Sequence, residues 1–227
     1  MLVASIVGLD TRTTMDIDTT VTSLPLTLPE AKNIVEKIAG IDLGDGVTFA
    51  VKSVSDIMED HDYPGLRFML DAHFDGLRQA IKIDISTGDT ITPAAISYNY
   101  KLMLEERSIC ILSYNLETLL AEKLETVMAR GLANTRMRDF YDIHVLLQEH
   151  ENEIDYPLLK QAFLKTSEKR NSTKYIGQIQ ETLFDVLRSE AMKNGWNTYA
   201  EKSFFVSDMK WETICNSVLL LAEKVTE

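Results

Sequence analysis

The sequence predicts an α/β (α+β) fold, in which a mixed sheet with flanking helices precedes a C-terminal helical bundle. In residues 1–112, short runs alternate apolar and polar side chains, as strands do; after about residue 115, apolar residues recur every three or four positions, as in helices. The 227 residues, 45% of them apolar, suffice for a real core. We therefore expect two domains, 1–112 and 113–227.

The first domain contains the strand signals. Because the chain opens on apolar residues, we interpret residues 1–8 as its first strand. The turn signal Asp75-Gly76 predicts a hairpin over 66–85, and Gly44-Asp-Gly46 reads as another hairpin turn rather than a phosphate loop. The predicted strands after the first cover 15–21, 47–54, 66–74 and 80–85.

Helix boundaries are indicated by capping residues. In the first domain, a helix over 28–39 has Thr27 before it and Gly40 after it. In the second, Asn115 can cap a helix that runs to residue 130 and ends at Gly131. Further helices are expected at 135–150, 155–166, 173–190 and 207–226.

Composition excludes several classes of protein. The net charge of −12 argues against broad nonspecific binding to nucleic acid or anionic membranes. The longest apolar run has five residues, 218–222, and no secretory signal opens the chain, so we expect no membrane association and a cytoplasmic location. One basic cluster is either a solvated helix end or a contact for an RNA acceptor: Lys165, Lys169, Arg170 and Lys174.

Carboxylates on neighbouring strands are the first candidate site. Asp16 and Asp18 are two positions apart on a predicted strand, so their side chains project from the same face. Their Cβ atoms would be about 6–7 Å apart, close enough to share Mg²⁺. Asp84, on another strand, is a candidate third metal ligand. The alternatives are a solvated strand face and a Lys82–Asp84 surface pair.

Two residues upstream of these acids could contact phosphate. Ser5 precedes Asp16 by a spacer of ten residues, and the small residues Ala4 and Gly8 would let a phosphate approach the backbone. Arg12 lies in the spacer and is either a phosphate contact or solvated.

The second domain contributes charged side chains on two helices. Lys123 adjoins an apolar stripe, where a lysine either extends to solvent or offers a positive charge to a triphosphate. Arg136 and Asp139 are spaced to pair on one helix face, which is either a structural ion pair or part of a site.

These motifs occur in an order that resembles a known family. They are Ser5-x10-Asp-x-Asp, Ile-Lys-Ile-Asp-Ile (81–85), Leu-Glu-Thr-Leu-Leu-Ala-Glu-Lys-Leu (116–124) and Thr-Arg-Met-Arg-Asp-Phe-Tyr-Asp-Ile (135–143). The set resembles the AbiEii/AbiGii-type nucleotidyltransferase toxins of the DNA polymerase β-like nucleotidyltransferase superfamily. The sequence departs from the family pattern at two positions: Ala4 stands where the Gly-Ser motif has glycine, and Arg138 stands where lysine is common. We also expect residues 1–112 to lack a segment that family members carry before the Gly-Ser strand.

The resemblance implies Mg²⁺-dependent transfer of a nucleotide from a nucleoside triphosphate to an acceptor, with tRNA as one acceptor. The chain would be the toxin of a toxin–antitoxin pair used in phage defence, with a cognate antitoxin as partner. The alternative is a non-catalytic module that binds a nucleotide or an antitoxin on the same scaffold. The implied roles are metal binding for Asp16, Asp18 and Asp84, catalysis for Asp16, Asp18, Lys123 and Asp139, and substrate binding for Ser5, Arg12, Arg136 and Arg138.

Overall fold

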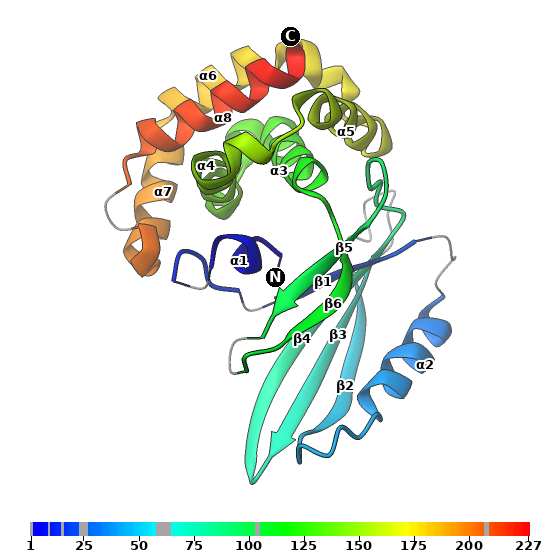
Figure 1. Cartoon of the computed structure of the whole chain (residues 1–227). Coiled ribbons are helices and arrows are strands. Elements are labelled where there is room, and N and C mark those ends of the chain that lie inside the picture. Colours follow the sequence, from blue (N-terminus) through cyan, green and yellow to red (C-terminus); the bar gives the residue numbers. More distant parts are fainter. Residues whose placement is uncertain are drawn as a thin grey trace. The chain divides into compact units, whose positions relative to one another are not determined.

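The computed structural model describes residues 2–8, 10–14, 16–22, 27–57, 65–102, 105–206 and 209–227. Their contacts divide them into two compact units (Figure 1). The strand unit spans Thr14–Asp89, and the helical unit comprises Leu2–Thr13 and Thr90–Glu227. This division differs from the predicted boundaries of 1–112 and 113–227, because the first helix and the last two strands group with the C-terminal helices.

The strand unit is a four-stranded mixed sheet with one helix, α2 (Leu28–Ala39). The strand order is β1-β4-β3-β2, with β1 parallel to β4 and the other pairs antiparallel. The mixed α+β class predicted from the sequence is therefore confirmed. The strands are β1 (Asp16–Val21), β2 (Thr48–Ile57), β3 (Gly65–Phe74) and β4 (Leu77–Thr87).

The β3–β4 hairpin is built by its turn residues. Asp75 and Gly76 both have positive φ, 44° and 79°, the combination that a two-residue turn between right-twisted strands requires. Phe74 therefore pairs with Leu77, and the register continues down both strands. The predicted hairpin is confirmed, whereas Gly44 and Gly46 lie between α2 and β2 and close no hairpin.

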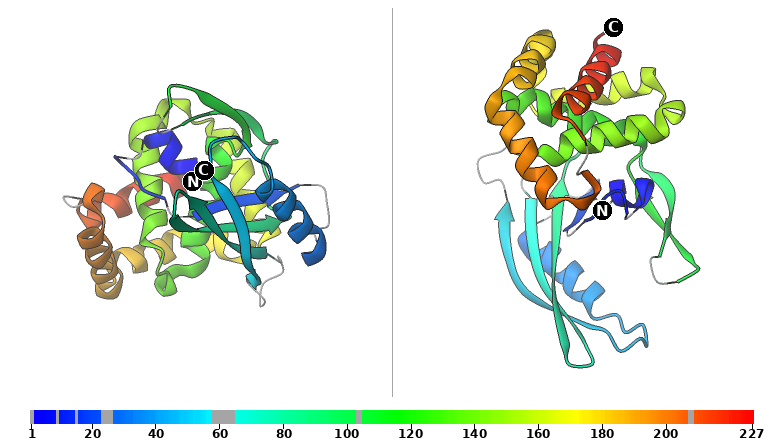
Figure 2. Two further views of the ribbon diagram at one scale, coloured as in Figure 1. Left: turned by 90° about the horizontal axis from the view of Figure 1, so that it is seen from below. Right: turned by 90° about the vertical axis from the view of Figure 1, so that its left-hand side faces the viewer.

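Alternation gives the sheet one apolar and one polar face. The apolar face packs against α2 through Ala31 and Val35, and Figure 2 shows the helix beside the strands. Thr27 caps that helix, as predicted, and it does so in a capping box with Glu30. The apolar face buries Leu66, Phe68, Leu70 and Ile85, and the polar face carries Asp16, Asp18, Arg67, Lys82 and Asp84.

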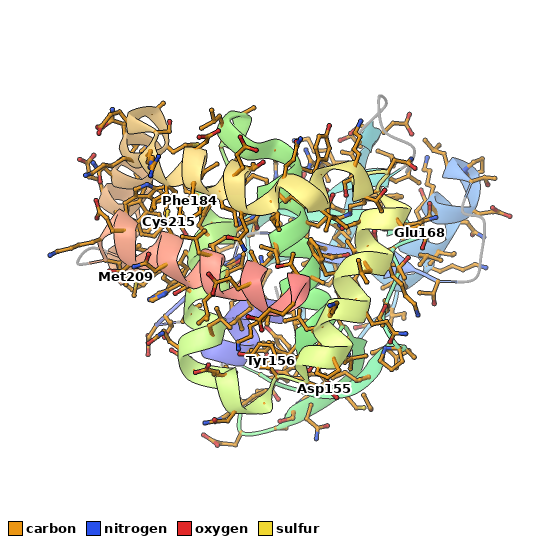
Figure 3. All side chains as sticks on the ribbon, turned by 90° about the horizontal axis from the view of Figure 1, so that it is seen from above. Asp155, Tyr156, Glu168, Phe184, Met209 and Cys215 are labelled. Atoms are coloured by element: carbon orange, nitrogen blue, oxygen red, sulfur yellow. The ribbon has the colours of Figure 1, made fainter. Side chains whose placement is uncertain are left out.

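The helical unit holds the larger core, which gathers around α3 and α4. Asn115 caps α3 through a bond from the Thr118 amide, as predicted. Figure 3 shows Cys215 on α8 and Tyr156 at the start of α5. Cys215 belongs to this core, and Tyr156 packs against it. The elements are α1 (Leu2–Val7), β5 (Ile96–Lys101), β6 (Ser108–Ser113), α3 (Leu116–Arg130), α4 (Met137–His150), α5 (Tyr156–Lys169), α6 (Ile179–Arg188), α7 (Glu190–Lys202) and α8 (Trp211–Thr226).

Two predictions about this unit were wrong. Leu2–Val7 is a helix and not a strand; Val3 and Val7 lie on its buried side, and short apolar runs do not distinguish the two structures. The predicted helix 173–190 is a 3₁₀ turn followed by α6, because Ser189 is extended and caps the separate helix α7. In the part of the chain described, no helix combines the length and apolar character needed to cross a bilayer.

Candidate functional site

The strand unit brings the predicted carboxylates onto adjacent strands. The parallel register of β1 and β4 pairs Asp18 with Asp84 and Asp16 with Lys82. Cross-strand partners project from the same face of a sheet, so all these side chains share its polar face. Parallel pairing thus joins two motifs that are 66 positions apart, counted from Asp18 to Asp84.

Each of two carboxylates on this face has a basic partner. Lys82 Nζ lies 2.8 Å from Asp16 Oδ2. Arg67 donates from Nε to Asp84 Oδ1 and from Nη2 to Asp84 Oδ2, both at 2.8 Å. The hydrogen bonds from Arg67 hold the pKa of Asp84 below its usual range. The Lys82–Asp84 pair considered as an alternative is replaced by these two pairs.

Sequence reasoning did not single out Arg67, although a signal for it exists. The turn at Asp75-Gly76 fixes the hairpin register, and counting outward from Phe74 and Leu77 places Arg67 directly opposite Asp84. A basic residue opposite a candidate carboxylate predicts an ion pair.

The donor chemistry of Asp16 and Asp18 suits Mg²⁺. This ion is commonly held by one or two carboxylates plus substrate phosphates and water, rather than by an all-protein cage. Within the described residues, no group of three or more His, Cys, Asp or Glu side chains is arranged to hold a metal. Asp16 and Asp18 are the side chains that could hold such an ion together with substrate phosphates, whereas Asp84 is hydrogen-bonded to Arg67.

The helical unit contains a second charged group, the buried charge cluster, formed by Arg12, Lys123, Asp139 and Asp142. Asp142 on α4 is at its centre and is fully buried. It accepts hydrogen bonds from Arg12 Nε at 3.0 Å, Arg12 Nη2 at 3.2 Å and Lys123 Nζ at 2.6 Å. Burial alone would raise the pKa of Asp142, but the charges of Lys123 and Arg12 outweigh it and hold that pKa low.

Lys123 and Asp139 contact each other within this cluster. Lys123 Nζ donates to Asp139 Oδ1 at 3.3 Å, and the lysine side chain is 12% exposed. Arg136 Nε lies 2.9 Å from Asp139 Oδ2, which is the predicted i,i+3 pair. Arg138 is half-buried one position before Asp139. Lys123 thus points at two carboxylates rather than extending to solvent.

Asp142 is the residue of this cluster for which no role was predicted. It lies three positions after Asp139, on the same face of α4, so helical periodicity carries a signal for it. Its partner Arg12 is 130 residues away and could not be inferred from spacing. Arg12 is buried, with Nη1 donating to the Thr13 carbonyl, so the predicted phosphate contact is occupied inside the protein.

Ser5 and the basic cluster are placed differently from expectation. Ser5 lies within α1, with its hydroxyl 3.0 Å from the Tyr98 hydroxyl on β5, and not at the end of a strand. Arg170 pairs with Glu125 at 2.7 Å and Glu122 at 3.4 Å, so acidic neighbours offset part of the basic cluster.

Comparison with known proteins establishes the family. The sequence model of the AbiEii nucleotidyl transferase toxins, described as a type IV toxin–antitoxin system, matches residues 1–216. The chain therefore belongs to the AbiEii nucleotidyl transferase toxin family, as the sequence motifs predicted.

Other comparisons add context. No curated protein matches the chain. Among solved structures, JHP933 from Helicobacter pylori is 16% identical, with a TM-score of 0.46 over 100% of this chain and 81% of that one. A candidate nucleotidyltransferase from H. pylori has the same identity and TM-score, with 84% of its chain covered. The family assignment rests on the family model.

Proposed function

We propose that this protein transfers a nucleotide from a nucleoside triphosphate to an acceptor hydroxyl, and that the reaction depends on Mg²⁺. The observation that carries the proposal is the pair Asp16 and Asp18 on one face of β1, in a chain of the AbiEii family. We further propose an RNA acceptor, tRNA in particular, and a role as the toxin of a phage-defence toxin–antitoxin pair.

The reaction is an in-line substitution at the α-phosphorus. The acceptor oxygen forms a bond to that phosphorus and loses its proton, while the bond to the bridging oxygen breaks and pyrophosphate leaves with the electron pair. Asp16 and Asp18 would hold Mg²⁺, which when bound supplies charge stabilisation to the phosphates.

Two further roles in this proposal come from the family resemblance of the motifs on α3 and α4. The ammonium of Lys123 has three N–H donors, of which two bind Asp139 and Asp142. The third would bind a phosphate oxygen, and the charge of Lys123 would offset that of the phosphate. Asp139 would orient the acceptor hydroxyl. Ser5, Arg136 and Arg138 remain proposed substrate contacts, whereas Arg12 would act through Asp142 by fixing its position.

The experiment is calorimetric titration of each of the four ribonucleoside triphosphates, with and without Mg²⁺, into the wild type and into the double variant Asp16→Asn/Asp18→Asn. We expect Mg²⁺-dependent binding of one nucleotide in the wild type and none in the variant. The matched control is Asp42→Asn/Asp45→Asn, in the exposed connection before β2, which should bind like the wild type. Absence of binding to every nucleotide would contradict the proposal.

A non-catalytic module is the second candidate function. The observation that favours it is that Lys82 and Arg67 already neutralise Asp16 and Asp84. In that case the titration would show nucleotide binding, but no pyrophosphate would be released when RNA is added.

A further inference from the structure

Arg67 occupies a particular place on the polar face of the strand unit. It is directly opposite Asp84 in the β3–β4 register, and Asp84 is directly opposite Asp18 in the β4–β1 register. The three side chains therefore form one row across three strands. Arg67 lies outside the motifs that carry the resemblance to the family.

The guanidinium of Arg67 is fixed in orientation yet partly open to solvent. Its Nε and Nη2 both bind Asp84, one to each carboxylate oxygen, which is the fork geometry that holds an arginine most firmly. Within the described residues, Arg67 donates its side-chain hydrogen bonds to Asp84. The side chain is 38% exposed, so the remaining N–H groups can reach a ligand.

Asp84, in turn, is poorly suited to bind a metal. Both of its oxygens accept hydrogen bonds from Arg67, so a metal ion on Asp84 would lie close to the positive guanidinium, which repels a cation. Its side chain is 17% exposed, less than the 38% of Arg67. Hydrogen bonding to Asp84 raises the pKa of Arg67, and the charges of Asp16 and Asp18 add to this, so Arg67 lies within electrostatic reach of both proposed metal ligands.

The charge on this face leaves a role for a cation besides the metal. Asp16, Asp18 and Asp84 together carry three negative charges, against two positive charges on Lys82 and Arg67. A bound triphosphate would add further negative charge, which one Mg²⁺ does not neutralise. Arginine is the side chain best suited to meet phosphate oxygens with a fixed planar fork.

We infer that Arg67 contacts the triphosphate of the nucleotide, and that Asp84 is the residue that positions Arg67 rather than a third metal ligand. This inference rests on the proposed function, because it concerns the nucleotide bound beside Asp16 and Asp18. It assigns the strand unit a phosphate-binding arginine and a two-carboxylate metal site.

The test compares variants at these two positions by calorimetry with the nucleotide that binds the wild type most tightly. Arg67→Gln should raise the Kd of that nucleotide about 10- to 100-fold at saturating Mg²⁺, the usual effect of losing a charged hydrogen bond. Arg67→Lys should recover part of the affinity, since it keeps the charge but loses the fork. Arg78→Gln is the matched control, because Arg78 pairs with Asp71 at 3.1 Å across the same two strands, and it should change the Kd less than about twofold.

A second readout separates positioning from metal binding. In Asp84→Asn, the Mg²⁺ concentration for half-maximal nucleotide binding should stay as in the wild type, while the Kd at saturating Mg²⁺ rises. In Asp16→Asn, the required Mg²⁺ concentration should rise instead. Because Asp84 acts through Arg67, the double variant Arg67→Gln/Asp84→Asn should bind no more weakly than Arg67→Gln alone.

The contrary results are distinct. Equal Kd values for Arg67→Gln and Arg78→Gln would overturn the phosphate contact, and a raised Mg²⁺ requirement in Asp84→Asn would make Asp84 a metal ligand. A wild type that binds no nucleotide would overturn the proposed function and this inference together. Thermal unfolding of every variant identifies any loss of affinity that comes from loss of folding.

Discussion

The polar face of the strand unit and the buried charge cluster of the helical unit contain the same types of charged residue but differ in burial. On the polar face of the strand unit, the exposed fraction of the paired side chains ranges from 17% for Asp84 to 38% for Arg67. In the buried charge cluster, Asp142 is fully buried and Asp139 is 4% exposed. Partly exposed pairs contribute little to stability and leave side chains within reach of a ligand, whereas breaking a buried pair leaves an uncompensated charge. The comparison indicates a face open to a ligand and a cluster that holds the helical unit together.

The largest effect on stability is expected from Asp142→Asn. It leaves Arg12 and Lys123 buried beside a neutral amide, so the free energy of unfolding should fall by about 3–5 kcal/mol. Urea unfolding measures this, and Glu149→Gln, an exposed position on the same helix, is the control. If Asp142→Asn lowered the free energy of unfolding by less than about 1 kcal/mol, the buried charge cluster would be no more important for stability than the polar face.

The double variant Asp16→Asn/Asp18→Asn should behave in the opposite way. Its free energy of unfolding should stay within about 1 kcal/mol of the wild type, because both side chains reach solvent. Nucleotide binding, in contrast, should be lost. A loss of stability as large as that of Asp142→Asn would show that these carboxylates hold the sheet together.

The buried histidine of α4 should give the protein a pH dependence. His144 Nδ1 lies 2.7 Å from Ser217 Oγ on α8, and burial lowers the pKa of His144. A depressed folded-state pKa contributes stability that is complete above the ordinary value of about 6.5 and is lost as pH falls through the folded-state pKa. Urea unfolding at pH 7.5 and 5.5 should therefore show a loss in the wild type that His144→Gln reduces. An equal loss in both proteins would assign the effect to other groups.

The smallest effect is expected from an exposed helix pair. Lys32 Nζ lies 3.7 Å from Glu36 Oε1 on α2, and both side chains are about half exposed. Lys32→Ala should change the free energy of unfolding by no more than about 0.5 kcal/mol. A larger loss in urea unfolding would mean that exposure does not rank the ion pairs of this protein.

Local signals explain which elements could be predicted. The Thr27 cap, the Asn115 cap and the Asp75-Gly76 turn each depend on residues within four positions, and each is present as expected. The residues 2–7 were assigned wrongly because six residues contain less than two helical turns, which is too short to show the helical period.

The site could be predicted only in part, because its pairings are long-range. The candidates Asp16, Asp18, Lys123 and Asp139 came from motifs, but their partners are fixed by tertiary structure. Arg12 meets Asp142 only once α4 has packed beside the segment that follows α1. Arg67 could be found by counting the hairpin register, whereas Arg12 could not.

Nucleotidyl transfer itself is tested most directly by measuring which phosphate of a radiolabelled nucleoside triphosphate becomes attached to RNA. The wild type and Asp16→Asn/Asp18→Asn would be incubated with Mg²⁺, total tRNA and the tightest-binding nucleoside triphosphate, radiolabelled at either the α- or the γ-phosphate. The account predicts covalent labelling of RNA from the α-label only, with pyrophosphate released, and no labelling by the variant. Labelling from the γ-phosphate, or undiminished labelling by the variant, would contradict it.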